Sequence, residues 1–534
     1  MIQAVGAFHK RFAGGRTGAC SGIRTSAPRA GGASRVGGNT RPHAALHMVG
    51  GLVDLRVLAT DMDIAQWTIP DPWLVTAAFA ASCATTILLI LRRPSVRVTV
   101  VKRTLRIDTY FLGALFGAIL LVAAGALDYG QVRRGLGGSG RLQPLGILAL
   151  FLSMVFISAF LDITGIFEYF ARLALRFARS DGRRLFFSLY CTVSVLTIFT
   201  SNDIIILTFT PFVYYFAREA DLNPVPYLVA EFFAANTWSM MLYIGNPTNI
   251  VIASAFDLRF LQYTAWMFLP TVTAGAVNAG MLYVLFRREI TKPIVRRDDI
   301  DPSAAITDRS GAVIGGIMLA CCVVGLAIAP YLHLEMWLVA LCFALALMAA
   351  LLIRGLAGFR ADARPGQVRG IEAVPVTLRR MPWAIVPFVL SLFVTVEALH
   401  VYGVTASVGR FFHGPGTGSG AFTSLVHGIG SALSANVLNN IPMTVAFTHV
   451  MSGLSGRPLL GAALATAVGS NLGANITPIG ALAGIMWMSI LRQKGCPLSF
   501  GRFMLYGVLI TPLALIACLA VLALELYTVA GLAG

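Results

Sequence analysis

The chain has 534 residues, of which 57% are hydrophobic and only 12% are charged, and its formal net charge is +17. Ordinary globular domains carry about 25% charged residues, whereas uncharged runs such as WLVTAAFAASCATTILLIL (73–91) are long enough to cross a hydrocarbon core. The composition therefore excludes a soluble globular protein and predicts a multi-pass protein of the cell (cytoplasmic) membrane, surrounded by the lipid bilayer. The positive charge is attributed to loop topology, and no nucleic-acid partner is expected.

The first segment, residues 1–72, differs in composition from the rest. The stretch RFAGGRTGACSGIRTSAPRAGGASRVGGNTRP is rich in glycine, arginine and serine, and it has neither acidic residues nor the apolar region of a secretory signal. Such a segment cannot bury a hydrophobic core. We expect a disordered basic tail that is dispensable for transport. A mis-assigned start is the alternative explanation, since Met48 and Met62 could also begin the protein.

The remaining chain is expected to be all-α, with about ten transmembrane helices, two of them broken, and two re-entrant hairpins. The hairpins are the apolar stretches 184–217 and 421–450, whose polar interruptions are tolerated at bilayer depth only inside protein or beside a water-filled cavity. The predicted spans are 73–91, 109–127, 144–168, 227–258, 260–287, 311–330, 334–353, 382–408, 458–491 and 503–528.

Basic residues orient these spans. With the hairpins in place, six loops fall on one side and hold most of the lysines and arginines, which marks that side as cytoplasmic. These loops are 92–108, 171–184, 212–226, 288–310, 354–380 and 492–502. There are two exceptions to this charge bias. The loop 128–143 would place Arg133, Arg134 and Arg141 outside, and the basic tail would also lie outside.

The two halves of the chain have the same order of elements. Each has two plain helices, a third with an embedded acid (Asp162 or Glu397), a hairpin, a broken helix and a closing helix. An odd number of spans in each half requires that the second be inverted. We therefore predict a first inverted repeat at 73–287, a cytoplasmic linker at 288–310 and a second repeat at 311–528. Matched interruptions in inverted repeats indicate a transporter's binding site near the membrane midplane.

The four interruptions read FTSNDIIILT (199–208), IGNPTNI (244–250), ANVLNNIPMT (435–444) and GSNLGANITPIG (469–480). Half-helices expose N–H groups that suit an anion or a hydroxyl-rich substrate, and C=O groups that suit a cation. We expect Gly245, Gly469, Gly473 and Gly480 to let the backbone leave the helix and approach a ligand. Helix–helix packing is the alternative role for all these polar and small residues. The predicted substrate- or ion-binding residues are Ser201, Asn202, Asp203, Gly245, Asn246, Thr248, Asn249, Asn439, Asn440, Ser470, Asn471, Asn475 and Thr477.

Three acids are candidates for ion coupling. Asp203 is the only acid in the four interruptions, and an ionisable group inside a span is a functional hypothesis by default. Its alternative role is a cap of the hairpin tip. Asp162 and Glu397 are either relay groups or structural groups of the bundle. Glu231 begins a predicted span and is expected to be interfacial.

The histidines and cysteines are weaker candidates for functional residues than the three acids. His400 and His427 are better explained as structural histidines than as titrating groups. The eight cysteines show no CxxC spacing, so buried small side chains are favoured over a metal site, with a soft-metalloid site at Cys321 and Cys322 as the alternative. There is no nucleotide-binding loop or nucleophile elbow. We therefore expect no enzyme activity, no catalytic residues, no cofactor and no metal, and any use of ATP would need a separate ATPase subunit.

The sequence resembles the ion transporter superfamily, and within it the arsenite–antimonite efflux permeases, from about residue 73 to 530. The most specific stretches are TSNDIIILTFTP, FFAANTWSMMLYIGNPTNIVI, LNNIPMT and SNLGANITPIGALAGIMWMSILRQKG. The resemblance implies two hairpins with Asn-bearing tips that meet two broken helices around one site, and an elevator-like movement of that unit. Members of this superfamily are often dimers, so the resemblance makes a homodimer one possible oligomeric state.

The absence of Lys and Arg from the four interruptions favours a neutral or weakly charged substrate. A trihydroxide of arsenic or antimony needs hydroxyl-matching groups, which Asn, Ser, Thr and backbone supply. Proton-coupled efflux of arsenite or antimonite is therefore expected. A sodium/proton antiporter or a citrate or dicarboxylate carrier has the same plan and remains the alternative, so the coupling ion is a proton or sodium. A channel would need a continuous polar stripe along several helices, which is lacking here.

Overall fold

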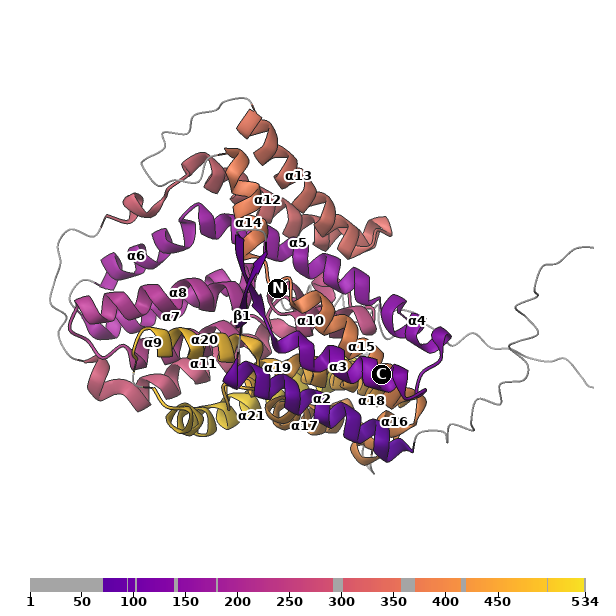
Figure 1. Cartoon of the computed structure of the whole chain (residues 1–534). Coiled ribbons are helices and arrows are strands. Elements are labelled where there is room, and N and C mark those ends of the chain that lie inside the picture. The colour runs from indigo at the N-terminus through magenta and orange to yellow at the C-terminus, as the bar shows by residue number, and fades with distance from the viewer. Residues whose placement is uncertain are drawn as a thin grey trace, which may run out of the picture. The chain divides into compact units, whose positions relative to one another are not determined.

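The computed structural model describes residues 71–93, 95–100, 103–138, 143–178, 181–291, 301–356, 370–413, 419–496 and 498–532. The predicted tail, apart from its last two residues, lies outside the described residues, as does Arg141. What is described is almost entirely helical, as predicted (Figure 1). Eight helices in this part of the chain are long and apolar enough to cross a membrane.

The first half of the chain contains both strands that the structure describes. Its elements are α2 (Pro72–Arg92), β1 (Ser95–Val100), β2 (Arg103–Asp108), α3 (Tyr110–Ala123), α4 (Tyr129–Gly137), α5 (Pro144–Ile163), α6 (Ile166–Ala178), α7 (Gly182–Phe199), α8 (Asn202–Glu219), α9 (Val225–Trp238), the 3-10 turn η1 (Tyr243–Gly245), α10 (Pro247–Ala255) and α11 (Phe260–Ile290).

The second half contains helices and no strand among its described residues. Its elements are η2 (Pro302–Ala305), α12 (Arg309–Ile328), η3 (Ala329–Leu332), α13 (Met336–Leu356), α14 (Gly370–Arg380), α15 (Ile385–Val401), α16 (Val404–Phe412), α17 (Gly420–Leu438), α18 (Asn440–Val450), η4 (Met451–Gly453), α19 (Gly456–Gly473), α20 (Leu482–Gln493) and α21 (Phe500–Leu532). The division into inverted repeats stays a prediction.

Two predicted spans are shorter than expected, because each contains a sharp turn. The span 144–168 ends at Ile163, and the span 382–408 ends at Val401. Gly165 (φ +84°) and Gly403 (φ +70°) then take the left-handed backbone that commonly follows a helix. A separate short helix starts after each glycine, α6 in the first half and α16 in the second.

Two connecting loops contain regular structure that the sequence analysis missed. Residues 95–108 form an antiparallel hairpin in which Ser95 pairs with Asp108, and the stretches SVRVTV and RTLRID supply β-branched residues for it. The basic loop 128–143 contains helix α4. Asp128 and Gln131 form a reciprocal capping box there, which satisfies the free N–H groups of the first turn.

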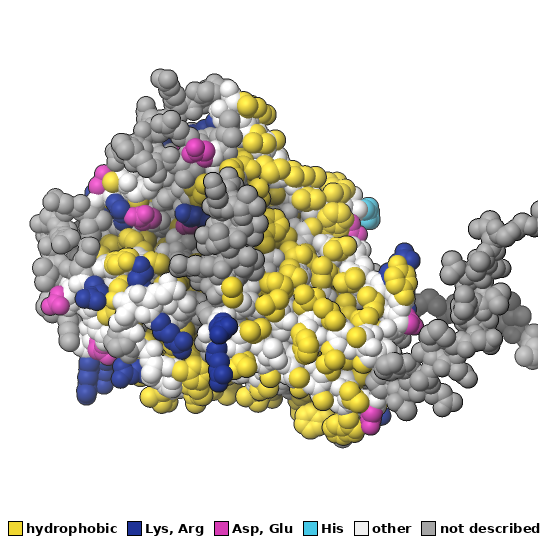
Figure 2. Space-filling view, viewed as in Figure 1, with side chains coloured by type: hydrophobic (Ala, Val, Ile, Leu, Met, Phe, Trp, Pro, Cys, Tyr) yellow, Lys and Arg dark blue, Asp and Glu magenta, His cyan; other side chains and the backbone are white. Residues whose placement is uncertain are grey.

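The broken helices lie in the most buried part of the structure. α9 is buried from Val225 to Thr237, and α19 from Leu460 to Gly473. α9 packs against α7, α8 and α11, while α19 packs against α17, α18 and α21 (Figure 1). By contrast, α12 and α13 expose much of their apolar surface, as helices that face lipid do. Figure 2 shows apolar side chains spread across one face, with most visible lysines and arginines gathered toward one end.

Close packing of α17 on α19 explains two glycines for which we expected another role. Gly469 and Gly473 lie inside α19 rather than in its break. A Cβ on Gly473 would lie 2.7 Å from the carbonyl oxygen of Ala432 in α17. The prediction that the glycine lets the backbone leave the helix is therefore wrong for Gly469, whereas Gly473 is the last residue of α19, directly before the break. They are the small residues that allow two membrane helices to approach closely.

We expect Gly469→Ala to destabilise the protein by about 1–3 kcal/mol, the usual cost of overpacking a core. The added Cβ would lie 2.0 Å from Ser431 Oγ and 2.5 Å from the Gly428 carbonyl oxygen. Thermal unfolding in detergent measures the change. Gly280→Ala in α11 is the matched control, because no heavy atom lies within 4 Å of its added Cβ. Equal unfolding temperatures for the two variants would contradict the packing role.

Candidate functional site

The first break separates α9 from α10 and spans residues 239–246. Its backbone makes a 3-10 turn at Tyr243–Gly245 before Asn246 caps α10 by accepting the Thr248 N–H at 3.1 Å. A Cβ on Gly245 would lie 2.3 Å from the Ser239 carbonyl oxygen, so glycine is required for the chain to fold back on itself here. Every residue from Met240 to Ala253 is buried.

The second break, residues 474–481, is held by the tip of the second hairpin. That tip is Asn439, whose φ of +75° separates α17 from α18. Its side-chain amide donates to the Ile479 carbonyl at 3.0 Å, and the backbone N–H of Asn440 donates to the Gly480 carbonyl at 2.9 Å. Backbone groups that the broken helix frees are thus satisfied by the hairpin, as burial at membrane depth demands.

Asn471 in the last turn of α19 joins the two breaks. Its Oδ1 accepts from Ser239 Oγ and from Asn246 Nδ2, both at 2.9 Å. Its Nδ2 donates to Asn249 Oδ1 at 2.6 Å. Beside it, Ser470 Oγ donates to Thr248 Oγ1 at 3.0 Å. Residues more than 220 positions apart therefore form one buried hydrogen-bonded cluster, which we call the break cluster.

A chain of three asparagines extends from the first hairpin to the second break. Asn202, the first residue of α8, donates through Nδ2 to Asn236 Oδ1 at 3.0 Å. Asn236 in α9 in turn donates to Asn475 Oδ1 at 3.1 Å. These bonds fix which atom of each terminal amide remains free. The arrangement brings the tip of hairpin α7–α8 and both broken helices together.

Four side-chain atoms on the two hairpin tips and in the second break are buried without a hydrogen-bond partner. They are Ser201 Oγ, Asn202 Oδ1, Asn440 Oδ1 and Asn475 Nδ2. An unsatisfied buried polar group costs about 1–3 kcal/mol, so several at one place call for an explanation such as a ligand. Three of the four atoms are oxygens, and one is an amide nitrogen.

The predicted site residues are therefore brought together, with one difference in burial. Twelve of the thirteen are buried, whereas Asp203 is partly exposed. Thr477 is also placed by a hydrogen bond, donating to Asn436 Oδ1 at 2.6 Å. The sequence analysis missed Asn236, Ser239 and Asn436 as members. Each is a polar residue within an apolar run close to an interruption, and that pattern was the available signal.

Asp203 lies in the first turn of α8 beside Asn202. The N-cap residue of α8 is Ser201, and Asp203 forms no hydrogen bond or ion pair with any residue that the structure describes. Its alternative role as a cap of the hairpin tip is therefore not supported. An ionisable group of this kind within an apolar hairpin is a candidate for binding a proton or a cation.

Asp162 and Glu397 both form ion pairs with arginines from the opposite half of the chain. Asp162 on α5 lies 2.6 Å from Arg380 of α14, and it also accepts from Thr208 Oγ1 at 2.9 Å. Glu397 on α15 lies 3.1 Å from Arg134 of α4. These contacts favour the structural role for both acids. They also give Arg134, which broke the loop-charge rule, a partner.

We expect Arg134→Gln to lower the thermal stability more than Glu397→Gln does. Arg134 is 50% exposed and Glu397 only 8% in their side chains, so removing the arginine leaves a buried carboxylate unpaired. Thermal unfolding in detergent measures both single variants and the double variant. The double variant should recover part of the loss from Arg134→Gln, and a purely additive result would contradict the pairing.

Glu231, which was expected to be interfacial, is buried within the protein. It lies within α9 at 1% exposure and contacts Thr210 of α8, and its depth in the membrane stays a prediction. His427 is buried with Nδ1 at 3.0 Å from the Thr423 carbonyl oxygen, and neither it nor His400 bonds to the break cluster. Of the vicinal cysteines, Cys322 is buried and Cys321 is exposed.

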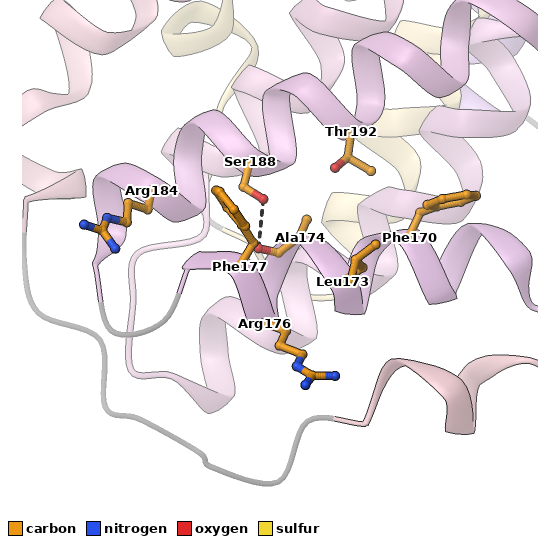
Figure 3. Close-up of a pocket in the computed structure, with 8 residues that line it drawn as sticks. All are labelled: Phe170, Leu173, Ala174, Arg176, Phe177, Arg184, Ser188 and Thr192. Atoms are coloured by element: carbon orange, nitrogen blue, oxygen red, sulfur yellow. Dashed lines mark hydrogen bonds between the residues drawn. The ribbon is translucent and has the colours of Figure 1, made fainter.

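A groove on the surface between α6 and α7 is separate from this site (Figure 3). Aromatic and basic side chains line it, and Ser188 Oγ spans its base by donating to the Ala174 carbonyl at 2.8 Å. None of the predicted site residues lines it. The lining residues are Phe170, Leu173, Ala174, Arg176, Phe177, Arg184, Ser188 and Thr192.

The sequence of the chain is similar to those of known membrane transporters. An "Arsenical pump membrane protein" from Yersinia enterocolitica is 29% identical over 71% of this chain and 86% of its own length. One from Escherichia coli is 26% identical over 77% of this chain and 93% of its own length. The solved YdaH transporter of Alcanivorax borkumensis has 16% identity and a TM-score of 0.47, over 85% of this chain and 97% of that one. The family model described as "Citrate transporter" matches residues 109–460, and the chain therefore belongs to that family of membrane transporters.

Proposed function

We propose that the chain is a secondary active transporter that exports arsenite or antimonite as the neutral trihydroxide, in exchange for protons. The observation that carries the proposal is the set of four unpartnered buried atoms on the two hairpin tips and in the second break. Three of them, on Ser201, Asn202 and Asn440, are oxygens that can accept hydrogen bonds. A trihydroxide offers three O–H donors to such acceptors, while Asn475 Nδ2 can donate to one of its oxygens. The names of the curated relatives support the same substrate.

A multiply charged carboxylate fits these atoms less well. Carboxylates only accept hydrogen bonds, so two of the four free atoms, the amide oxygens of Asn202 and Asn440, would repel one. No Lys or Arg side chain bonds to the break cluster within the described residues. Oxygens of this kind also suit a sodium ion. A sodium/proton antiporter is therefore the stronger alternative, and a citrate or dicarboxylate carrier is the weaker one.

Asp203 is the proposed coupling group. An uncharged substrate gains nothing from the membrane potential, so uphill export needs a cation that moves in the opposite direction. Asp203 adjoins Asn202, which belongs to the asparagine chain, and it forms no ion pair with any described residue. Movement of the hairpin tip across the membrane would favour its neutralised form. Proton binding at Asp203 would thereby be linked to substrate binding beside it.

Everted membrane vesicles test this function. Vesicles that contain the protein should accumulate arsenite when an inward-acid pH gradient is imposed, with saturation, and vesicles without it should not. Parallel assays with sodium and with citrate test the alternatives. Citrate or sodium flux without arsenite flux would overturn the assignment of arsenite as the substrate. Flux without saturation would indicate a channel. No flux of any of these substrates would contradict a transporter.

A further inference from the structure

Glu231 is a buried acid that the proposed mechanism does not use. It lies in the middle of α9, five residues before Asn236 of the asparagine chain, and its exposure is 1%. One carboxyl oxygen, Oε1, lies 2.9 Å from Thr210 Oγ1 of α8. The other, Oε2, is buried without any hydrogen-bond partner. An ionised carboxylate would leave this oxygen unsolvated in the interior, at high energetic cost.

Counting hydrogens at Thr210 indicates where a proton resides. The Thr210 hydroxyl lies 2.5 Å from the Ile206 carbonyl oxygen, four residues earlier in the same helix. A carbonyl oxygen can only accept, and a hydroxyl has a single hydrogen to donate. The Thr210 hydroxyl therefore donates its hydrogen to the Ile206 carbonyl oxygen, which is a common pattern for threonine inside a helix. The contact with Glu231 then needs its hydrogen from the carboxyl group.

No basic side chain of the described residues takes the place of that proton. The ionisable groups away from the ends of the surrounding helices are Asp203, Tyr214 and Tyr215 on α8, Tyr190 and Cys191 on α7, Tyr263 and Tyr283 on α11, and Tyr506, Cys518 and Glu525 on α21. Arginines occur at the ends of α7, α8, α11, α19, α20 and α21, and Glu219 and Glu289 lie at the ends of α8 and α11. None of these groups forms a hydrogen bond or ion pair with Glu231 in the described part of the chain. Phe232 of α9 also packs against the aromatic rings of Trp487 in α20 and Phe503 in α21.

We propose that Glu231 is a second proton-binding site of the transporter, which holds a proton in this conformation through a hydrogen bond from its carboxyl group to Thr210. The role of this site in coupling rests on the proposed function, whereas the presence of a bound proton does not. Thr210 follows Asp203 by seven residues on α8, about 10 Å along the axis at 1.5 Å per residue. The bond thus ties the helix that carries Asp203 to the half-helix that carries Asn236.

Loss of the proton would weaken this connection. The carboxyl group would release H⁺ to water, and the resulting carboxylate could keep its contact with Thr210 only by taking the hydroxyl hydrogen away from Ile206. Oε2 would still lack a partner, and the need to hydrate the charge would loosen the packing of α8 on α9. Protonation at Glu231 would therefore favour the packed arrangement described here, and deprotonation an arrangement in which water reaches the two helices.

Infrared difference spectroscopy of the purified full chain across a pH step tests the site without any transport substrate. Wild type should show the carbonyl stretch of a buried protonated carboxyl group that disappears at high pH. Glu231→Gln should lack this band, since its amide can donate to Thr210 in the same way and preserve the fold. Glu525→Gln is the matched control, because Glu525 Oε2 is likewise buried without a partner. It should retain the Glu231 band.

Thr210 supplies a second test that does not need the Gln variant to fold. Thr210→Val removes the acceptor and should shift the frequency of the band, whereas Thr210→Ser should leave it unchanged. In vesicles, Glu231→Gln should lose pH-driven accumulation but retain substrate exchange. An unchanged band in Glu231→Gln, or wild-type pH-driven accumulation by that variant, would overturn the proposal. A Glu231 band in a protein that moves no arsenite would support the proton site and refute the proposed substrate instead.

Discussion

Asp203→Asn should reduce pH-driven arsenite accumulation in everted vesicles by about tenfold or more, because a side chain fixed in the neutral state cannot exchange a proton. The variant preserves the shape of the side chain, and Asp203 makes no hydrogen bond with a described residue that the change could break. Substrate binding and exchange without a gradient should therefore remain measurable. The defect is expected in coupling and not in recognition.

Two controls separate this result from a general defect. Glu168→Gln removes an acid that only pairs with Arg172 on the surface of α6 and should transport normally. Unfolding temperature in detergent should be close to wild type for both variants. If Asp203→Asn accumulates substrate against a gradient as well as wild type, the coupling group lies elsewhere, and Glu231 is then the first candidate because Asp162 and Glu397 are ion-paired.

Asn471→Ala should abolish transport and also destabilise the fold by roughly 3 kcal/mol or more, at about 1–3 kcal/mol for each buried polar group left unpaired. Its side chain satisfies Ser239, Asn246 and Asn249, and all of these are buried. The loss of function would then follow in part from a loosened connection between the two breaks. Thermal unfolding in detergent and vesicle uptake measure the two effects.

Asn475→Ala is the informative comparison. This side chain forms one hydrogen bond, to Asn236, and its Nδ2 is free. The variant should lose transport with a stability change near 1 kcal/mol, the typical value of a single hydrogen bond. Equal destabilisation by Asn471→Ala and Asn475→Ala, with proportional loss of transport, would favour a packing role for both. A difference between them would separate the residues that hold the breaks together from those that contact substrate.

The asparagines of the site fall into two groups, which differ in whether their side-chain amides are already hydrogen-bonded. Asn246, Asn249 and Asn471 satisfy one another, so their amides are occupied before any ligand arrives. Asn202 and Asn475 lie at the ends of the asparagine chain, each with one unpartnered atom. We expect ligand contacts at the second group and mechanical coupling between the broken helices at the first.

The sequence by itself determined the membrane class, the order of the helices and the positions of the interruptions. These features depend on local composition: long apolar runs form helices that can span a bilayer, and clusters of Gly, Asn, Pro and other polar residues interrupt them. The interruptions at Thr200–Ser201, Asn439 and the two breaks are accordingly found close to where the sequence predicts them. Turns such as Gly165 were missed because the apolar pattern continues across them.

Only the tertiary structure decided which of these residues are partners. Asn471 meets Asn246 across 225 positions, and Arg134 meets Glu397 across 263, separations over which sequence spacing carries no information. Glu231 looks interfacial from its position near the start of a span, yet the helices around α9 bury it. Gly469 appears to belong to the break, yet a close neighbour, Ser431, explains it. Burial and pairing depend on which helices pack together, and that is a property of the whole fold rather than of any local segment.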